Sequence, residues 1–310
     1  MGDWLQSLVP WGTQAILWVQ SFRTGALDIL FLLATFLGEE LFLIMLFSAI
    51  YWCLDKSVGI ALCYLVTLSN YVNSWAKLLY RIPRPAHPNI AVLRDESSPS
   101  FPSGHAQNSV VLWGYLATRI RRPAAWLAAA IIVLLVASSR VYLGIHFPQD
   151  LVGGLLIGVL LLILFVWLVR PIIVPWVRRQ RWIILVAFSM AIPLLMMFIH
   201  PTDYQGRWPA KDAVMVCGVV AGASIGFLIE SRFIRFQVAG AWWRRVVRLI
   251  VGAVLIALFY AIPSVLLPRN IPPGAEIAAR FIRYGLLAFV LAAGAPWLFI
   301  RLGLAGRQPA

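Results

Sequence analysis

Long stretches without a charged residue constrain this chain more than any other feature. Residues 151–169 and 182–199 are almost entirely apolar. A run of about 18 or more apolar residues is long enough to cross the hydrocarbon layer of a bilayer as a helix. Charged residues make up only 12% of the 310 residues, whereas a soluble domain usually carries about 25%. The sequence therefore predicts an all-α fold, a polytopic transmembrane helical bundle.

The apolar segments predict about nine or ten membrane spans. They cover residues 24–38, 40–54, 57–79, 105–120, 124–143, 149–170, 181–199, 212–230, 247–267 and 281–300. The first two are short for full spans, and Gly38, Glu39 and Glu40 interrupt them, so a tilted or broken pair is expected there. We interpret the two glutamates as a solvated flank.

Three regions are expected along the chain. Residues 1–23 contain four apolar residues on one face of a short helix between Trp4 and Trp11, which is typical of a segment lying at the membrane interface. Residues 24–175 contain every polar motif and are expected to form a six-helix core. Residues 176–310 carry no chemical motif and are expected to add about four transmembrane helices of unknown role.

The formal charge of +14 does not indicate a nucleic-acid-binding protein. The basic residues form short clusters between apolar segments and do not gather on one soluble face. Excess Lys and Arg mark the cytoplasmic side of a membrane protein, and the clusters alternate with the polar stretches 81–104 and 144–150. Those two stretches are therefore expected on the extracytoplasmic side of a cell membrane. The three cysteines form no CxxC pair, so neither a disulfide framework nor a zinc site is expected.

The first polar cluster, at residues 77–85, places two cations at the end of an apolar segment. Pro83 and Pro85 are expected to end the helix, which leaves Lys77 and Arg84 near the membrane boundary. Considered alone, this segment is better explained as a helix end whose basic side chains extend (snorkel) to the membrane surface.

The second polar cluster is Pro102-Ser103-Gly104-His105, directly before an apolar segment. Ser103 is expected to cap the helix and Gly104 to let a ligand approach the backbone. The free N–H groups and dipole of a helix start favour an anion, and His105 would lie beside it. An ordinary capped helix with an unrelated histidine explains this cluster equally well.

The third polar cluster runs from Ser139 to Asp150. Arg140 closes one apolar segment, and Pro148 suits the first turn of the next helix. Asp150 follows His146 by four residues, which is close enough to orient the imidazole. A carboxylate bound to one ring nitrogen fixes the tautomer and leaves the other nitrogen free to attack. Ionisable groups beside membrane helices are costly, so this set indicates a functional site.

Together, the three clusters resemble the signature motifs of the type-2 phosphatidic acid phosphatase superfamily, which also includes the vanadium haloperoxidases. The pattern is Lys, six residues, Arg-Pro; Pro-Ser-Gly-His; and Ser-Arg, five residues, His, three residues, Asp. All eleven specified positions match in order. The resemblance covers roughly residues 25–175 and is to the integral membrane lipid phosphatase branch.

The resemblance implies a catalytic role for three residues. His146 would attack phosphorus and form a phosphohistidine, Asp150 would orient it, and His105 would protonate the leaving oxygen. The phosphate-binding residues implied in the same way are Lys77, Arg84, Ser103, Gly104 and Arg140. Three basic side chains can stabilise a transferring phosphoryl group without a metal. No Asp-rich magnesium site is visible near the motifs, and we expect neither a metal nor another cofactor.

These features predict an enzyme that dephosphorylates a membrane lipid phosphate or diphosphate, such as phosphatidic acid, phosphatidylglycerol phosphate, a sphingoid-base phosphate or a polyprenyl diphosphate. Its partners would be that lipid and the bilayer, with no nucleic acid. Three alternatives remain open: a phosphotransferase acting on a lipid or sugar acceptor, a vanadate-dependent peroxidase, and a lipid transporter or scramblase. Four further residues of the long loop could contact a lipid head group, but we do not count them as site residues: His87, Arg94, Asp95 and Glu96.

Overall fold

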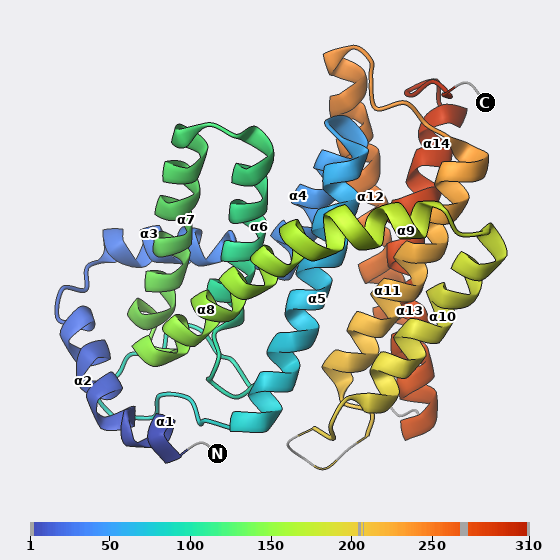
Figure 1. The fold of residues 1–310 in the computed structure, drawn as a ribbon. Helices are drawn as coiled ribbons and strands as arrows, with labels where there is room; N and C mark the ends of the chain where they lie inside the picture. Colours follow the sequence, from blue (N-terminus) through green and yellow to red (C-terminus); the bar gives the residue numbers. More distant parts are fainter. Residues whose placement is uncertain (1–2, 204–205, 207, 267–271, 309–310) are drawn as a thin grey trace. The chain divides into compact units, whose positions relative to one another are not determined.

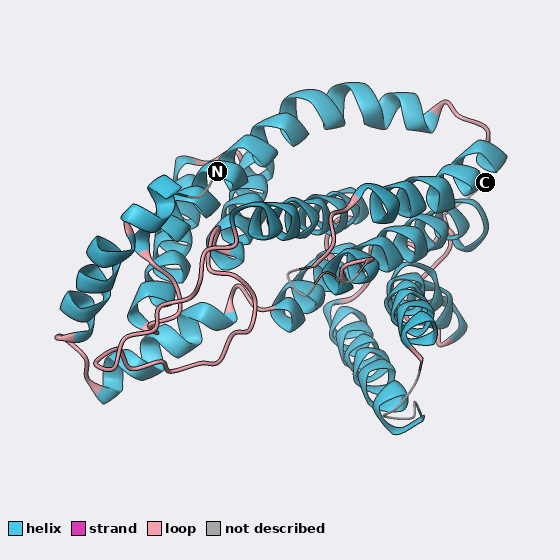
Figure 2. Ribbon diagram, turned by 90° about the horizontal axis from the view of Figure 1, so that it is seen from below, coloured by secondary structure: helices cyan, strands magenta, loops and turns pink. Residues whose placement is uncertain are grey.

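The computed structural model describes residues 3–203, 206, 208–266 and 272–308. In this part of the chain the secondary structure is helical, apart from one isolated bridge between Phe236 and Arg307. Figure 2 shows these helices joined by loops. The all-α prediction is confirmed. The chain divides into two compact units, one made of the residues up to Leu43 together with Leu68–Val174, and the other of Ile44–Thr67 together with the chain from Pro175 onward.

The first unit contains the three polar clusters. Its helices are α1 (Asp3–Ser7), α2 (Val9–Gln20), α3 (Gly25–Phe36), α6 (Gly104–Ile120), α7 (Pro123–Tyr142) and α8 (Pro148–Leu164), which continues as the π-helical η1 (Phe165–Ile173). It also holds the start of α4 (Glu40–Cys53) and the end of α5 (Lys56–Tyr80). A loop of residues 81–103 connects α5 to α6.

Helices α6 and α7 form an antiparallel hairpin, and α3 runs across α7 (Figure 1). Helix α8 approaches α6 closely because α8 carries glycines on the facing side. A Cβ at Gly158 would lie 2.8 Å from the carbonyl oxygen of Gln107, and one at Gly154 would collide with the carbonyl of Ser103. Small residues allow this approach in membrane helices. The close packing brings the first turn of α8 beside the first turn of α6.

The second unit is also helical. It contains α9 (Val174–Arg178) from Pro175 onward, α10 (Trp182–Ile199), α11 (Lys211–Ile229), η2 (Glu230–Ile234), α12 (Trp242–Leu266), α13 (Pro273–Phe289), η3 (Val290–Gly294) and α14 (Ala295–Arg301). Helices α11 and α13 pack tightly, since a Cβ at Gly218 would lie 2.5 Å from the carbonyl oxygen of Phe281. Buried Arg248 donates hydrogen bonds to four backbone carbonyls, including that of Trp52 at 3.0 Å. The Arg248 side chain therefore has a structural role in this unit.

Several helices are long and apolar enough to span a bilayer. Within the described residues these are the continuous stretches Pro123–Tyr142, Pro148–Arg178, Trp182–Ile199, Lys211–Ile234 and Gly274–Arg301. Helices α3 and α4 add a sixth candidate if they count as one span, and they are bent by 53° at the break between them. A broken pair at this position was expected from residues 38–40, and the structure confirms it.

The two units do not follow the order of the sequence. The first unit ends at Val174, but Ile44–Thr67 belongs to the second unit although it precedes the motifs. Helices α4 and α5 therefore each contribute to both units. The functional regions expected at residues 1–23, 24–175 and 176–310 stay predictions, because a compact unit need not be a functional region.

Candidate active site

The third cluster folds into a tight turn that buries His146 between α7 and α8. The backbone N–H groups of Ile145 and His146 both donate to the carbonyl of Arg140, at 3.2 and 3.3 Å. Gly144 supplies the left-handed conformation that this turn requires, with φ of +72°. Helix α8 begins at Pro148, as expected, and His146 is 1% exposed.

Asp150 holds one nitrogen of the His146 ring. Its Oδ2 accepts the backbone N–H of Phe147 at 2.8 Å and lies 3.3 Å from His146 Nδ1. The hydroxyl of Ser100 donates to the same oxygen at 2.5 Å. These bonds fix the carboxylate beside Nδ1, so Nδ1 is the nitrogen it orients.

Arg84 reaches the other nitrogen of the His146 ring. Its Nη1 donates to the carbonyl of Ile145 at 2.7 Å and lies 3.1 Å from His146 Nε2. Its Nε donates to the carbonyl of Ser98 at 2.7 Å. A guanidinium only donates, so this network assigns the lone pair of His146 to Nε2 and the proton to Nδ1. That is the tautomer a nucleophilic imidazole needs.

Burial and surrounding cations both keep His146 neutral. Burial of the ring lowers the pKa of His146 well below its ordinary value, and the positive charges of Arg84, Arg140 and Lys77 lower it further. Both causes disfavour the imidazolium form. The His146 ring is therefore uncharged at neutral pH.

The second cluster starts helix α6 as the sequence predicted. Ser103 is the N-cap, and its side-chain oxygen accepts the N–H of Ala106 at 3.4 Å. Its own N–H donates to the carbonyl of Asp150 at 2.9 Å, which ties the start of α6 to the start of α8. A Cβ at Gly104 would lie 3.2 Å from Oδ1 of Asn73. The cap uses only an oxygen lone pair, so the hydroxyl hydrogen of Ser103 stays available to another acceptor.

The ring of His105 contacts a carboxylate that the sequence did not identify. Its Nε2 lies 3.0 Å from Oε1 of Glu39, the residue between α3 and α4. The interpretation of Glu39 as a solvated flank is wrong, because its side chain is only 21% exposed and also binds Arg94 at 2.8 Å. The Gly-Glu interruption between two short apolar segments was the available signal.

A loop carboxylate lies between two of the predicted phosphate-binding cations. Arg140, which is 1% exposed, donates to Oε1 of Glu96 at 2.7 Å, and Arg84 Nη2 lies 3.6 Å from Oε2. Burial alone would raise the pKa of Glu96, but the charges of Arg140 and Arg84 bring it below its ordinary value. Glu96 is thus an ionised carboxylate, and the two arginines already hold an anionic group.

Five of the predicted site residues lie in one network within the first unit, namely Lys77, Arg84, Arg140, His146 and Asp150. The side chain of His105 bonds instead to Glu39, and its charge acts on the His146 ring. Lys77 donates to the hydroxyl of Ser98 at 2.6 Å, and Ser98 also accepts from Arg84 at 3.2 Å. Arg140 joins them through Glu96. Ser98 and Ser100 were not predicted as site residues, because a serine in a polar loop has no feature in the sequence that distinguishes it.

Comparison with known proteins identifies relatives of both units. A model of the PAP2 superfamily matches residues 58–174. A second model, described as a PAP2 superfamily phosphatase transmembrane extension, matches residues 214–307. Together, these matches extend the similarity well beyond the three motifs.

Individual relatives are lipid phosphatases by name. The chain is 26% identical to sphingosine-1-phosphate phosphatase 1 of Mus musculus, over 89% of this chain and 72% of that protein. It is 29% identical to a probable sphingosine-1-phosphate phosphatase of Dictyostelium discoideum, over 68% of this chain but only 55% of the relative. It is 31% identical to a lipid A 4'-phosphatase of Bacteroides thetaiotaomicron, over 47% of this chain and 71% of that protein.

One solved structure is also similar to this chain. It is a transmembrane PAP2 type phosphatidylglycerolphosphate phosphatase from Bacillus subtilis, with 27% sequence identity and a TM-score of 0.47. The match covers 54% of this chain and 87% of the solved one.

Proposed function

The chain belongs to the PAP2 superfamily, and we propose that it is a metal-independent phosphatase of a membrane lipid phosphate or diphosphate that works through a phosphohistidine on His146. The observation that carries this proposal is that each ring nitrogen of His146 contacts a charged side chain of opposite kind, a carboxylate on one side and a guanidinium on the other. Asp150 binds Nδ1, and Arg84 donates toward Nε2. The nucleophile is therefore neutral, correctly oriented and next to a phosphate-binding cation.

In the first step, Nε2 of His146 attacks phosphorus while the bond from phosphorus to the lipid oxygen breaks. Arg84, Arg140 and Lys77 bind the non-bridging oxygens, where negative charge is concentrated. His105 gives a proton to the departing lipid oxygen. The products of this step are a free lipid alcohol, or a lipid monophosphate when the substrate is a diphosphate, and a phosphohistidine.

In the second step, water attacks the phosphohistidine. His105, now neutral, takes a proton from that water, and the bond between Nε2 and phosphorus breaks. Inorganic phosphate leaves, and both histidines return to their starting protonation states. Water is thus the only co-reactant that the cycle consumes.

Glu96 must leave the cations before a substrate phosphate binds. Its carboxylate bridges Arg84 and Arg140, and a phosphate cannot share those donors without strong repulsion from it. Exchange of a carboxylate for a phosphate keeps the buried arginines paired with an anion throughout, which avoids the cost of an isolated buried charge.

The lipid nature of the substrate is supported by the relatives and by the setting of the site. The relatives are named for sphingosine-1-phosphate and lipid A, whose phosphates are attached to membrane lipids. Helices α7 and α8, which carry Arg140 and Asp150, are both apolar enough to span a bilayer. The distribution of basic residues supports an extracytoplasmic site in a cell membrane.

Phosphate release by the purified protein from a panel of lipid phosphates tests the proposal. The panel contains phosphatidic acid, phosphatidylglycerol phosphate, a sphingoid-base phosphate and a polyprenyl diphosphate, each with and without EDTA. We expect free inorganic phosphate from at least one lipid, at a rate that EDTA does not change. Phosphate label recovered on an added lipid or sugar alcohol would instead indicate a phosphotransferase, and loss of activity in EDTA would contradict metal independence.

A further inference from the structure

The bend between α3 and α4 places a carboxylate against His105. Helix α3 ends at Phe36, α4 begins at Glu40, and Glu39 lies between them. The N–H groups of Gly38 and Glu39 donate to the carbonyls of Thr35 and Phe36 at 2.9 and 3.0 Å, which fixes the turn. Glu39 Oε1 then lies 3.0 Å from His105 Nε2.

The same bend is shaped around the His105 ring. A Cβ at Gly38 would lie 2.5 Å from Cδ2 of His105 and 3.1 Å from its Cγ. Any larger residue at this position would displace the imidazole or the bend. Close packing at Gly38 is a second observation, independent of the contact between Glu39 and His105, that joins the bend to His105.

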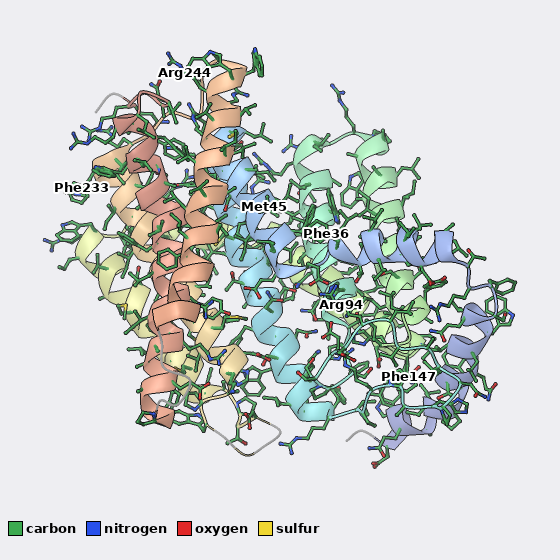
Figure 3. All side chains as sticks on the ribbon, turned by 180° about the vertical axis from the view of Figure 1, so that it is seen from behind. Phe36, Met45, Arg94, Phe147, Phe233 and Arg244 are labelled. Carbon is green, nitrogen blue, oxygen red and sulfur yellow. The ribbon has the colours of Figure 1, made fainter. Side chains whose placement is uncertain are left out.

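Arg94 fixes the orientation of the Glu39 carboxylate. Its Nη1 lies 2.8 Å from Oε1 and its Nη2 lies 2.9 Å from Oε2, which is a two-pronged contact. Such forks set the plane of a carboxylate and keep it ionised. Figure 3 labels Arg94 and also Phe36, the last residue of α3, close to this bend. Oε1 of Glu39 is thus shared by Arg94 and His105, and Arg94 alone contacts Oε2.

We propose that Glu39 is a positioning residue for the leaving-group acid, holding Nε2–H of His105 so that Nδ1–H donates the proton to the departing lipid oxygen. This inference rests on the proposed function. The proton on Nε2 stays between the ring and Glu39 throughout. The proton on Nδ1 moves to the lipid oxygen in the first step and is replaced from water in the second.

Electrostatics explain why His105 needs this carboxylate. A general acid must carry its proton when the substrate binds, yet burial of the His105 ring, and after it the positive charge of Arg140, disfavour the imidazolium form. Glu39 and Glu96 are the carboxylates that face it, and Glu96 must leave the arginines when phosphate binds. Glu39 then remains as the negative charge that favours the imidazolium form.

The site therefore contains two carboxylate–histidine pairs with complementary roles. Asp150 binds Nδ1 of His146 and leaves Nε2 as a nucleophile. Glu39 binds Nε2 of His105 and leaves Nδ1 as a proton donor. Both pairs use an ionised carboxylate to select which ring nitrogen faces the reaction, as in other imidazole-based sites.

A comparison of leaving groups distinguishes this role from a structural one. A lipid alkoxide leaves poorly and requires a proton donor, whereas p-nitrophenolate leaves without one. The value of kcat/KM reports only steps up to release of the leaving group, so hydrolysis of the phosphohistidine does not affect it. For Glu39→Gln we expect kcat/KM on the lipid phosphate to fall about 100-fold, within the range of general acid catalysis. We expect kcat/KM on p-nitrophenyl phosphate to change by less than threefold.

The control variants are Glu39→Asp, which keeps the carboxylate, and Glu40→Gln, which removes the neighbouring one. Glu39→Asp should recover part of the lipid activity, and Glu40→Gln should show no difference between the two substrates. Preserved p-nitrophenyl phosphate hydrolysis by Glu39→Gln also shows that the variant is folded. Equal losses on both substrates, or no loss on either, would overturn the role of Glu39 while leaving the proposed function intact. A wild-type protein that hydrolyses no lipid phosphate would instead overturn the proposed function.

Discussion

Arg84 Nη1 lies 3.1 Å from Nε2 of His146. Because an arginine N–H cannot accept a hydrogen bond, this contact makes Nε2 an acceptor and assigns the ring proton to Nδ1, beside Asp150. The same guanidinium donates to the carbonyl of Ile145 at 2.7 Å, so it also supports the turn that carries the histidine. Arg84 thereby acts on the tautomer, the position and the charge of His146.

Removal of the Arg84 charge should change the pH dependence of the reaction. In the proposed mechanism His146 attacks in its neutral form. Its pKa lies well below the ordinary value of 6.5, so that form is present at neutral pH and is lost only as the pH falls through the lowered pKa. In Arg84→Gln the pKa of His146 should rise, and the acidic limb of kcat/KM should move to higher pH, with activity at least about 10-fold lower. Arg84→Lys, which keeps the charge, should retain the wild-type limb. An unchanged limb in Arg84→Gln would contradict the electrostatic role.

Glu96 should compete with anions for the two arginines. Its carboxylate accepts from Arg140 at 2.7 Å, and an incoming anion must displace it. We expect Glu96→Gln to bind the competitive inhibitors phosphate and vanadate about 3- to 10-fold more tightly, since the amide is a weaker partner for a buried cation than a carboxylate is. Inhibition constants measured against a soluble phosphate ester check this. Asp95→Asn is the matched control, and equal or weaker inhibition of Glu96→Gln would show that the carboxylate does not occupy the phosphate position.

Helix α8 packs so closely against α6 that a residue larger than glycine should not fit at Gly158. A Cβ at Gly158 would lie 2.8 Å from the backbone oxygen of Gln107, whereas a Cβ at Gly25 would meet nothing within 4 Å. Gly158→Ala should therefore destabilise the protein by about 1–3 kcal/mol, as overpacking usually does. Gly25→Ala should leave the stability unchanged or slightly higher. Thermal unfolding of both variants in the same detergent is the measurement, and equal melting temperatures would contradict the close packing.

Local relationships in the site could be read from the sequence. Asp150 contacts the histidine four residues before it, and Ser103 caps the helix that follows it. Both depend on one turn of backbone, whose geometry is set by Pro148 and by the Ser-Gly start of α6. The presence of helices followed from the apolar runs in the same way, because a bilayer requires every backbone group to be bonded within its own helix.

Contacts between distant segments could not be read in this way. Glu39 and His105 are 66 residues apart, and two adjacent glutamates in a short interruption look the same whether they face water or a buried histidine. Likewise, nothing in the apolar pattern separates Ile44–Thr67 from the helices around it, yet it belongs to the second unit. The Glu39–His105 contact and the placement of Ile44–Thr67 both depend on tertiary packing. A single sequence gives the residue types but does not show which residues contact one another.

Covalent labelling of His146 tests the central claim most directly. Purified protein is mixed briefly with a lipid substrate carrying labelled phosphate, denatured and digested, and the label is located by mass spectrometry. We predict label on His146 that is stable in base and released in acid, as expected of a phosphohistidine, and none in His146→Ala. The loop variant His87→Ala should label normally. Wild-type turnover without label on His146, or near-normal phosphate release by His146→Ala, would contradict the account.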